Sequence, residues 1–391
     1  MKRDKQHIKI GYVGGVDVGL RLPIIELLHA KGHDICAIGP LKQKNIFESR
    51  NIPYEVYPFK AGAKIFSEFA SFLKLYSIFK KHQFTIVHTF NTKPAIVGRL
   101  AAKLAGVPCI IATITGLGSL FSENSIQNKI LRIFYTLGQR ISCSASNMTI
   151  FQNQDDLEFF TSKKIAPPTK VKLLRGSASE LDIEAFSLEK LRQKDLTLVK
   201  EDLGYDSNQI RIFLICRLLK YKGIKEYLEA SRILKQSYNN LCFYLVGPSD
   251  NTMYGFPLEG LEEYKDIVKY LGYRNDIPEI LSFADILVHP TYYREGLPRI
   301  LLEAACLEIP IVTTDMPGCR EVVEDGVNGY LIPPKDPNAL AEAIEKLILN
   351  KNLRQKMGQV GRERIVEEFS LEAVCQETLE VYNDLLQNLK R

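Results

Sequence analysis

Short apolar runs rich in β-branched and aromatic residues alternate along most of this chain with longer amphipathic stretches. The candidate strands are HIKIGYV, DICAIG, FTIVHTF, CIIATIT, MTIFQN and VKLLRG, and then RIFLICRL, CFYLVGP, DILVHPT, IPIVTTD and GYLIPP. The candidate helices between them include LRLPIIELLHAKG, AIVGRLAAKLAG, GIKEYLEASRILKQ, LPRILLEAACLE and ALAEAIEKLILN. Strands that alternate with helices of this length indicate βαβ units and parallel sheets. The sequence therefore predicts an α/β protein with two doubly wound, Rossmann-like domains.

Two domains also suit the length of 391 residues, because a single hydrophobic core rarely grows beyond about 250–300 residues. A charged, strand-poor segment near residues 176–208 separates the two series of strands, and the second series begins at Ile210. The tail from Ser370 has a helical pattern and adds no further strand. We therefore place the domains at residues 1–185 and 186–369, followed by a final helix over 370–391.

Composition limits the classes of partner and compartment. The net charge of +5 is too small to indicate nucleic-acid binding, and the eight cysteines include no C-x-x-C pair, which favours reduced cytosolic thiols over disulfides or a zinc site. Glycines and Asp17 interrupt the first apolar stretch, so it does not resemble a signal peptide. No run approaches the roughly 18 apolar residues of a spanning helix. We expect a cytoplasmic protein that is soluble or peripheral.

The richest motif lies at residues 289–334, where Glu295 and Glu303 are separated by seven residues. Ligands of open α/β sheets bind beyond the carboxyl ends of the strands, and Glu295 with Gly296 follows the strand DILVHP. Pro298 suits the first helical position, and the N–H groups near Gly296 and Leu297 would form an anion site. Glu303 on an otherwise apolar helix would need partners such as a ribose diol. The alternative is an ordinary helix with a stray glutamate.

This segment resembles the donor-binding signature of the family 4 retaining glycosyltransferases of the GT-B fold, including their E-x7-E pair. The resemblance continues through Gly318, Glu321, Gly326, Asn328 and Gly329. It implies that Glu295 contacts the hydroxyls of a donor sugar and that Glu303 holds a ribose. It also implies two Rossmann-like domains facing across a cleft, an N-terminal acceptor-binding domain, a C-terminal nucleotide-sugar-binding domain and a final helix that crosses back to the N-terminal domain.

A second motif, RLLKYKG at residues 217–223, directly follows the strand RIFLIC. Arg217 and Lys222 would project from the strand end and its loop, where cations stabilise a departing diphosphate. The stretch is similar to the R-x4-K-G phosphate clamp of the family. Solvated surface charge is the alternative interpretation. With Glu295, these two residues form the predicted catalytic set.

The loop GYVGGVDVG at residues 11–19 is not G-x-G-x-x-G, so it does not indicate a nicotinamide or flavin cofactor. Similar enzymes use a glycine-rich loop here to bring backbone close to the donor phosphates and the acceptor. The resemblance therefore implies roles for Gly14 and Gly15, with Gly15 a donor-binding candidate. The alternative is a tight turn that needs positive φ.

Residues 87–108 resemble the acceptor-side segment of polyprenyl-diphosphate-sugar transferases. The resemblance implies acceptor contacts by His88 and Lys93, with Lys93 near an acceptor diphosphate; a satisfied core histidine is the alternative for His88. Thr115 stands before Gly116 where many relatives carry His-Gly, so its hydroxyl or the nearby backbone would substitute. A second departure, RGSASELD at residues 175–182, replaces the more usual G-S-G-V-D.

No D-x-D sequence is present, and GT-B enzymes generally use basic residues and helix dipoles in place of a metal. We therefore expect neither a metal nor another cofactor, with the UDP-sugar serving as donor substrate. Residues 60–84 and 128–140 combine basic residues with aromatics, a composition that suits an anionic membrane surface. The alternative is that these helices pack on their own sheet. We expect peripheral contact with the inner face of the cell membrane.

Together these features predict a retaining, metal-independent glycosyltransferase. The resemblance implies transfer of a hexose or N-acetylhexosamine from a UDP-sugar to a lipid-linked, polyprenyl diphosphate saccharide in surface polysaccharide or glycan biosynthesis. Two alternatives remain open: a UDP-sugar 2-epimerase of the same fold, and a non-catalytic sugar-nucleotide-binding partner subunit. The identities of the sugar and the acceptor do not follow from the sequence.

Overall fold

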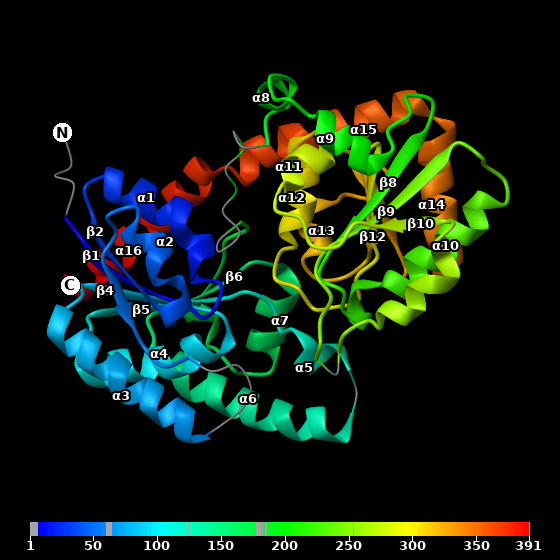
Figure 1. Cartoon of the computed structure of the whole chain (residues 1–391). Helices are drawn as coiled ribbons and strands as arrows, with labels where there is room; N and C mark the ends of the chain where they lie inside the picture. The colour runs from blue at the N-terminus through cyan, green and yellow to red at the C-terminus, as the bar shows by residue number, and fades with distance from the viewer. Residues whose placement is uncertain are drawn as a thin grey trace. The chain divides into compact units, whose positions relative to one another are not determined.

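The structure is a computed structural model that describes residues 7–59, 65–123, 125–176, 181, 183, 186–252 and 254–390. The chain divides into two compact units, residues 1–180 with 371–391 and residues 181–370 (Figure 1). Each unit is described here by itself. The start of the basic stretch at residues 60–84 and most of the departure at 175–182 lie outside the described residues.

The first unit contains a parallel sheet in the order β3-β2-β1-β4-β5-β6-β7. Its strands are β1 (Lys9–Val13), β2 (Asp34–Gly39), β3 (Tyr54–Val56), β4 (Ile86–Phe90), β5 (Cys109–Ile114), β6 (Met148–Phe151) and β7 (Val171–Leu173). The inner strands β4 and β5 are buried on both faces, which is why they read as continuous apolar runs in the sequence. The direction of strand progression reverses between β1 and β4, so ligands of this sheet are expected at their carboxyl ends.

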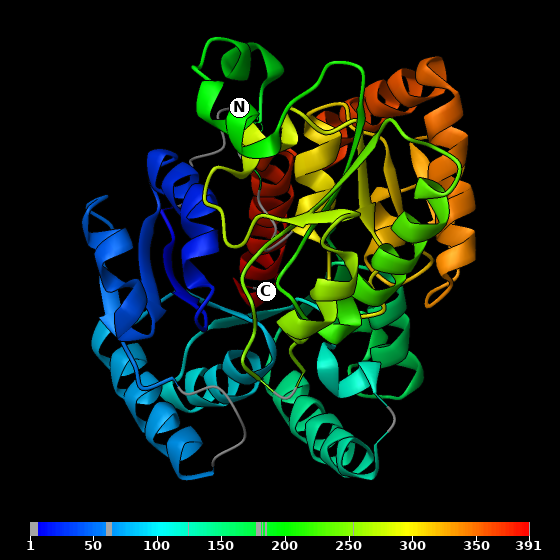
Figure 2. The same ribbon diagram turned by 45° about the vertical axis from the view of Figure 1, so that its right-hand side comes forward.

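Helices cover both faces of this sheet. They are α1 (Leu22–Ala30), α2 (Lys44–Glu48), α3 (Ile65–His82), α4 (Thr92–Ala105), α5 (Ser119–Ser122), α6 (Ile126–Ala145), α7 (Gln154–Ser162) and α16 (Leu371–Lys390). Helices α1 and α16 pack on one face with Ile10 and Ile35, and α3 and α4 pack on the other with Val13 and Ile38. Because side chains alternate across a strand, neighbouring strand residues supply the two cores. Figure 2 shows α3, α4 and α6 on the same side of the sheet.

The second unit repeats the plan with a parallel sheet in the order β10-β9-β8-β11-β12-β13. Its strands are β8 (Ile210–Ile215), β9 (Leu241–Val246), β10 (Val268–Tyr270), β11 (Ile286–His289), β12 (Ile311–Thr314) and β13 (Gly329–Ile332). Its helices are α8 (Leu188–Arg192), α9 (Thr197–Leu203), α10 (Ile224–Lys235), α11 (Ile277–Leu281), α12 (Arg299–Cys306), α13 (Cys319–Val322), α14 (Pro337–Leu349) and α15 (Lys351–Glu368). The prediction of two doubly wound α/β units is confirmed.

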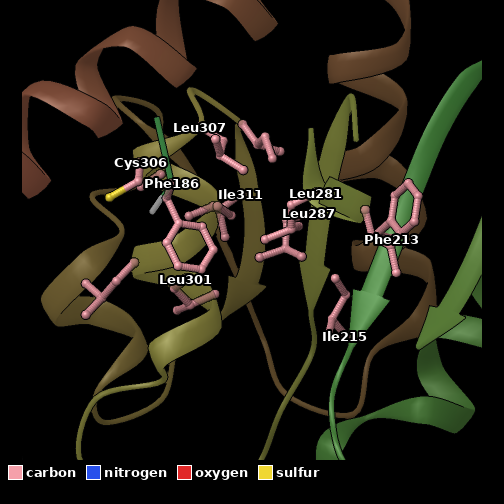
Figure 3. Packing of buried hydrophobic residues seen from close by; sticks show 14 of the residues in the cluster. Phe186, Phe213, Ile215, Leu281, Leu287, Leu301, Cys306, Leu307 and Ile311 are labelled. Atoms are coloured by element: carbon pink, nitrogen blue, oxygen red, sulfur yellow. The ribbon is translucent and has the colours of Figure 1, made fainter. Parts of the chain in front are cut away.

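One face of the second sheet packs against α12 and the other against α10 and α14. Figure 3 shows the first of these cores, which contains Phe213 and Leu287 of the strands and Leu301 of α12. This packing fixes α12 beside β11 and therefore fixes the loop that joins them. The reversal of strand order in this sheet falls between β8 and β11. The loops that follow these two strands carry the motifs RLLKYKG and HPTYYREG.

All eight cysteines are free thiols, and six of them are buried. Burial raises the pKa of the Cys109 thiol to about 12, so the buried thiols behave as small core residues. Within the described ranges, no helix has the length and apolar character needed to cross a membrane.

Candidate functional site

The loop after β8 brings Lys222 to the carboxyl edge of the second sheet. The chain leaves β8 at Ile215, makes a 3₁₀ turn over Lys220–Lys222 and enters α10 at Ile224. Gly223 joins turn and helix with φ of 72°, in the left-handed region. A Cβ at Gly223 would lie 2.0 Å from the carbonyl oxygen of Pro290, in the loop after β11. The two motif-bearing loops are therefore in backbone contact at this point.

The loop after β11 places the Glu295 carboxylate against Lys222. The Lys222 Nζ lies 2.7 Å from Glu295 Oε1, and both side chains are largely buried. The same oxygen lies 3.1 Å from His289 Nε2 and 3.2 Å from Thr291 Oγ1. The Lys222 ammonium also stands 5.7 Å from the centre of the Tyr293 ring. Two residues predicted from separate motifs thus form one cluster with His289 and Thr291.

This cluster keeps both charges. Burial alone would raise the pKa of Glu295, but the nearby Lys222 ammonium and His289 outweigh it and hold that pKa well below its usual range. Burial would lower the pKa of Lys222, but the Glu295 carboxylate outweighs it and raises that pKa. An ionised carboxylate accepts hydrogen bonds and an ammonium donates them. The cluster therefore presents a fixed anion that can accept hydrogen bonds and a fixed cation that can donate them.

Glu303 lies on α12, which begins at Arg299 and ends at Cys306. Its Oε1 accepts a hydrogen bond of 2.9 Å from Arg299 Nε. Burial raises the pKa of Glu303, and Arg299 only partly offsets this effect. The structure places Pro298 at the N-cap of α12, one residue before the first helical position that we predicted. Buried Gly296 and Leu297 lead directly into this N-cap.

Arg217 lies apart from the Lys222–Glu295 contacts. Its side chain is 57% exposed and its Nε stands 3.5 Å from Asp250 Oδ2. The prediction that Arg217 and Lys222 emerge near the end of the same strand agrees with their positions after β8. The Arg217 side chain, however, pairs with Asp250 in the loop after β9. Arg217 is therefore the most solvent-accessible member of the predicted catalytic set.

Two further residues of the signature, Gly318 and Asn328, support the loop that carries Glu295. Gly318 has φ of 82°, and a Cβ there would lie 2.6 Å from the carbonyl oxygen of Gly296. The buried Asn328 amide donates to Val322 O at 2.9 Å and accepts from the N–H of Glu324 at 2.8 Å. These contacts fix the backbone around α13 against the Glu295 loop. They indicate a structural role for this part of the signature.

In the first unit, Gly14 and Gly15 follow β1, but neither is among the residues with positive φ. Neighbouring side chains lie so close to both glycines that a larger residue would not fit at either position. A Cβ at Gly14 would lie 2.7 Å from Cβ of Val18, and one at Gly15 would lie 3.0 Å from the Phe59 ring. Tyr57 Oη donates to Gly14 O at 2.9 Å. Tight packing, and not a left-handed turn, is the local reason for these two glycines.

The predicted acceptor contact by His88 is wrong for this arrangement of the unit. His88 is 1% exposed, and its Nδ1 and Nε2 lie 2.7 Å from Tyr382 Oη and 2.8 Å from Thr113 Oγ1. Burial and the Arg21 charge lower the pKa of His88 to about 3. Both ring nitrogens therefore serve the core, where Tyr382 ties α16 to the sheet. His88 is a satisfied core histidine.

Lys93 and Thr115 lie at the carboxyl edge of the first sheet. The Lys93 Nζ pairs with Glu68 of α3 at 2.6 Å. Thr115 Oγ1 donates to Asn91 Oδ1 at 2.5 Å, and Asn91 Nδ2 donates to Asp17 Oδ1 at 2.6 Å. All five side chains are partly exposed. Lys93 and Thr115 remain acceptor-side candidates, and Glu68 is a partner that the sequence pattern did not indicate.

Sequence reasoning missed three residues of the second site. His289 and Thr291 contact Glu295, and Arg299 contacts Glu303. The available signal was positional. His289 ends β11 and Thr291 lies between it and Glu295, and Arg299 stands four residues before Glu303 on one helix face. The sequence analysis considered only the two glutamates of this segment and therefore gave no role to His289, Thr291 or Arg299.

Two Rossmann-like units, with a lysine–glutamate cluster at the strand reversal of the second, define the class as a glycosyltransferase of the GT-B fold. A solved structure titled as a glycosyltransferase from Rickettsia africae shares this fold, with a TM-score of 0.80 and 18% identity over 98% of this chain and 100% of that one. The model described as "Glycosyl transferases group 1" matches residues 197–364, and "Glycosyl transferase 4-like" matches residues 9–153. The chain belongs to the family 4 glycosyltransferases.

Two named bacterial relatives match most of the chain. An N,N'-diacetylbacillosaminyl-diphospho-undecaprenol alpha-1,3-N-acetylgalactosaminyltransferase of Campylobacter jejuni is 26% identical over 98% of this chain and 100% of the relative. A UDP-Gal:alpha-D-GlcNAc-diphosphoundecaprenol alpha-1,3-galactosyltransferase of Escherichia coli is 27% identical over 83% of this chain and 81% of the relative. The resemblance drawn from the E-x7-E segment is thereby confirmed.

Proposed function

We propose that this glycosyltransferase moves a hexose or N-acetylhexosamine from a UDP-sugar to a saccharide carried on a polyprenyl diphosphate, with retention of anomeric configuration. The product would enter a surface polysaccharide or glycan. The observation that carries the proposal is the Lys222–Glu295 pair of 2.7 Å at the strand reversal of the second sheet. It joins a phosphate-binding cation to a hydroxyl-binding anion, the two groups that a sugar diphosphate requires.

Each residue of the second unit has a role in this proposal. Lys222 and Arg217 bind the diphosphate, and the N–H groups of Gly296 and Leu297 add the positive end of α12. Glu295 orients the donor sugar through its hydroxyls. Glu303, largely buried on α12, accepts hydrogen bonds from the ribose diol. We propose Gly15, in the first unit, as a further backbone contact to the donor.

The chemistry follows a front-face route. The acceptor hydroxyl oxygen forms the new bond to the anomeric carbon on the face from which the diphosphate leaves. The bond from that carbon to the diphosphate breaks, and a leaving phosphate oxygen takes the hydroxyl proton. Lys222 and Arg217 stabilise the charge that develops on the diphosphate, a task that a metal performs in other transferases. We therefore propose a metal-independent reaction in which Glu295 orients the sugar and does not act as a nucleophile.

The acceptor proposal is supported by the names of both relatives, which specify diphospho-undecaprenol saccharides. We place the acceptor on the first unit, with Lys93 near its diphosphate and Thr115 near its sugar. The printed name of the Escherichia coli relative specifies a UDP-linked donor, which supports UDP over other nucleotides. Both relatives are named as transferases, which favours transfer over 2-epimerisation. The retained charge pair favours an active enzyme over a binding subunit.

The test is nucleotide release. Purified protein is incubated with a panel of UDP- and GDP-sugars, with and without an extract of polyprenyl diphosphate saccharides, and the free nucleoside diphosphate is measured. We expect release with one UDP-sugar only when the extract is present. In Glu303→Ala the donor KM should rise about 10- to 100-fold, because hydrogen bonds to a charged group contribute roughly 1.5–3 kcal/mol.

The matched control is Glu342→Ala, an exposed glutamate of α14, whose donor KM should equal that of the wild type. Release without any acceptor, accompanied by a change in the sugar, would indicate an epimerase. Donor binding with no release under any acceptor would indicate the binding subunit. Either result contradicts the proposed transfer.

We further propose that α6 lies on the surface of an anionic membrane. Its buried face carries polar residues that include Asn128, Gln139 and Ser142. The large apolar side chains instead face outward: Ile126, Ile130, Leu131, Ile133, Phe134, Leu137 and Ile141. Ile126 is 79% exposed and Phe134 67%. A helix that turns its apolar face to the outside needs an apolar environment there.

The neighbouring surface has the charge and shape for a bilayer. Exposed Lys129 and Arg140 flank the apolar face of α6, and α3 carries exposed Phe69 and Leu73. Both α3 and α6 pack against α4, and Figure 1 shows these three helices along one side of the first sheet. Aromatic and aliphatic residues bordered by basic ones suit an anionic leaflet. This surface supports a peripheral position at the inner face of the cell membrane.

Vesicle sedimentation tests this surface. Wild-type protein should sediment with phosphatidylcholine vesicles that contain phosphatidylglycerol, and less with phosphatidylcholine alone. The double variant Ile133→Glu, Phe134→Glu should bind about a hundredfold more weakly, since burial of each such side chain contributes roughly 1.5–3 kcal/mol. Leu198→Glu, a similarly exposed leucine of α9 in the second unit, is the control and should bind like the wild type. Equal sedimentation of both variants, or dimerisation through α6 without vesicles, would refute the membrane assignment.

A further inference from the structure

We propose that His289 is a positioning residue whose Nε2–H holds the Glu295 carboxylate in the orientation that the donor sugar requires. This inference rests on the proposed function of the second unit and adds a residue to it. His289 is the last residue of β11, the strand that leads into the Glu295 loop. With 1% exposure, it acts on the substrate only through another group.

The geometry identifies which ring nitrogen carries the proton. His289 Nε2 lies 3.1 Å from Glu295 Oε1. The pKa of Glu295 is well below its usual range, so the carboxylate is ionised and only accepts. Burial lowers the pKa of His289 despite the opposing effect of Glu295, so the ring is neutral with one N–H. That N–H must therefore be on Nε2, where it donates to Glu295.

The other nitrogen has no compensating contact. His289 Nδ1 is a buried atom without a hydrogen-bond partner among the described residues. A buried polar atom left unpaired is unfavourable, and an apolar side chain at the end of β11 would avoid it. Packing therefore does not account for a histidine at this position. The contact made by Nε2 does.

The surrounding contacts hold the His289 backbone in place and show which neutral donor serves Glu295. The carbonyl oxygen of His289 accepts a hydrogen bond of 2.7 Å from Thr313 Oγ1 on the neighbouring strand β12. Thr291 Oγ1 lies 3.2 Å from Glu295 Oε1 and also 3.2 Å from Tyr221 O. A hydroxyl has a single hydrogen, so Thr291 cannot serve both acceptors at once. His289 is thus the neutral donor committed to Glu295, beside the charged donor Lys222.

The experiment compares His289→Gln with His289→Leu. The glutamine amide nitrogen can replace Nε2–H, whereas leucine fills the space without a donor. Both variants should bind UDP like the wild type. The kcat of His289→Leu should fall about 10- to 100-fold, because a small misplacement of a reacting group can cost about a hundredfold. His289→Gln should retain most of the wild-type kcat. Equal kcat values for the leucine variant and the wild type would overturn the inference, as would equal loss in both variants.

A second measurement does not depend on activity or on the folding of a variant. Nitrogen-15 NMR of the wild-type protein labelled at histidine should show His289 as the neutral tautomer protonated at Nε2. A ring protonated at Nδ1, or at both nitrogens at neutral pH, would overturn the inference. If the wild type transfers no sugar, the proposed function fails while the tautomer still reports on His289. If the wild type and His289→Leu transfer equally well, only the role of His289 fails.

Discussion

Replacement of Lys222 by methionine is expected to destabilise the second unit by about 3 kcal/mol and to lower the kcat of transfer by about 10²–10³. The reason for the instability is the carboxylate that remains. Glu295 lies 2.7 Å from Lys222 in a largely buried setting, and removing one partner of a buried pair costs roughly 3–5 kcal/mol. We take the lower end because His289 and Thr291 still contact Glu295 Oε1. The melting temperature should fall by roughly 6–12 °C.

The loss of transfer has a separate cause. Under the proposed function, Lys222 stabilises the charge on the departing diphosphate, and removal of one such donor lowers kcat by about 10²–10³. The double variant Lys222→Met, Glu295→Gln separates the two effects. It should recover most of the lost stability, because no unpaired charge remains. It should recover no activity.

The pKa values of Glu295 and Lys222 determine the pH at which the wild type and the Lys222 variants should be compared. The lowered pKa of Glu295 makes its stabilisation fully present above the ordinary glutamate value of about 4.3 and lost as pH falls through the lowered pKa. The raised pKa of Lys222 makes its stabilisation fully present below about 10.4 and lost as pH rises through the raised pKa. At pH 7.5 the whole contribution of the pair is therefore measured.

Thermal unfolding and nucleotide release are measured on the same samples, with Lys225→Met as the control. Lys225 is an exposed lysine in the first turn of α10, and its loss should leave both readings unchanged. A Lys222→Met protein as stable as the wild type would show that the pair is not buried as the structure describes. A stable, fully active variant would remove Lys222 from the catalytic set.

Most of the fold could be predicted from the sequence because both sheets are buried on two faces. Their inner strands are therefore continuous apolar runs, such as CIIATI in β5 and IRIFLI in β8. The two strands that the sequence did not reveal, β3 and β10, lie at the sheet edges and have three residues each. Runs this short carry no periodic signal. The equally short edge strand β7 was predicted because it continues into the apolar residues of VKLLRG.

Two glycines weaken the helical pattern of one segment. The polar segment that forms α15 contains Gly358 and Gly361, residues that normally disfavour a helix. A Cβ at Gly358 would lie 1.8 Å from the carbonyl oxygen of Glu308. The glycine is thus required by contact with the end of α12, a tertiary cause that overrides local propensity. Sequence patterns that score each segment by itself cannot register such a contact.

In the candidate site, too, the sequence indicated individual residues but not the contacts between them. Lys222 and Glu295 were each selected from motifs that follow strands β8 and β11. Their mutual ion pair depends on β8 and β11 being neighbours in the sheet, and sequence order alone does not fix that. For His88 the sequence left two possibilities, an acceptor contact or a core position. Its hydrogen bonds to Tyr382 and Thr113 place it in the core. Both partners lie far from His88 in the sequence, so the sequence pattern could not indicate them.

Substitution of Gly223 by alanine is expected to have a large effect on stability. Gly223 has φ of 72°, where an L-residue costs roughly 1–2 kcal/mol. The added Cβ would also lie 2.0 Å from the carbonyl oxygen of Pro290 and 2.6 Å from its carbon. Because Pro290 directly follows His289, relief of this overlap must move the loop that holds Glu295. We expect a loss of more than about 3 kcal/mol and no measurable transfer.

Comparison with Gly204→Ala shows how much of the stability loss in Gly223→Ala comes from the overlap with Pro290. Gly204 also has positive φ, at 65°, but no heavy atom lies within 4 Å of a Cβ built there. It should therefore lose only the roughly 1–2 kcal/mol of left-handed strain and should keep its transfer activity. Melting temperatures of the two variants give the difference directly. If both melt at the same temperature, the turn and the Pro290 loop are not in contact. A larger fall in Gly223→Ala, with transfer lost in that variant alone, would mean that this backbone contact holds together the two loops that carry Lys222 and Glu295.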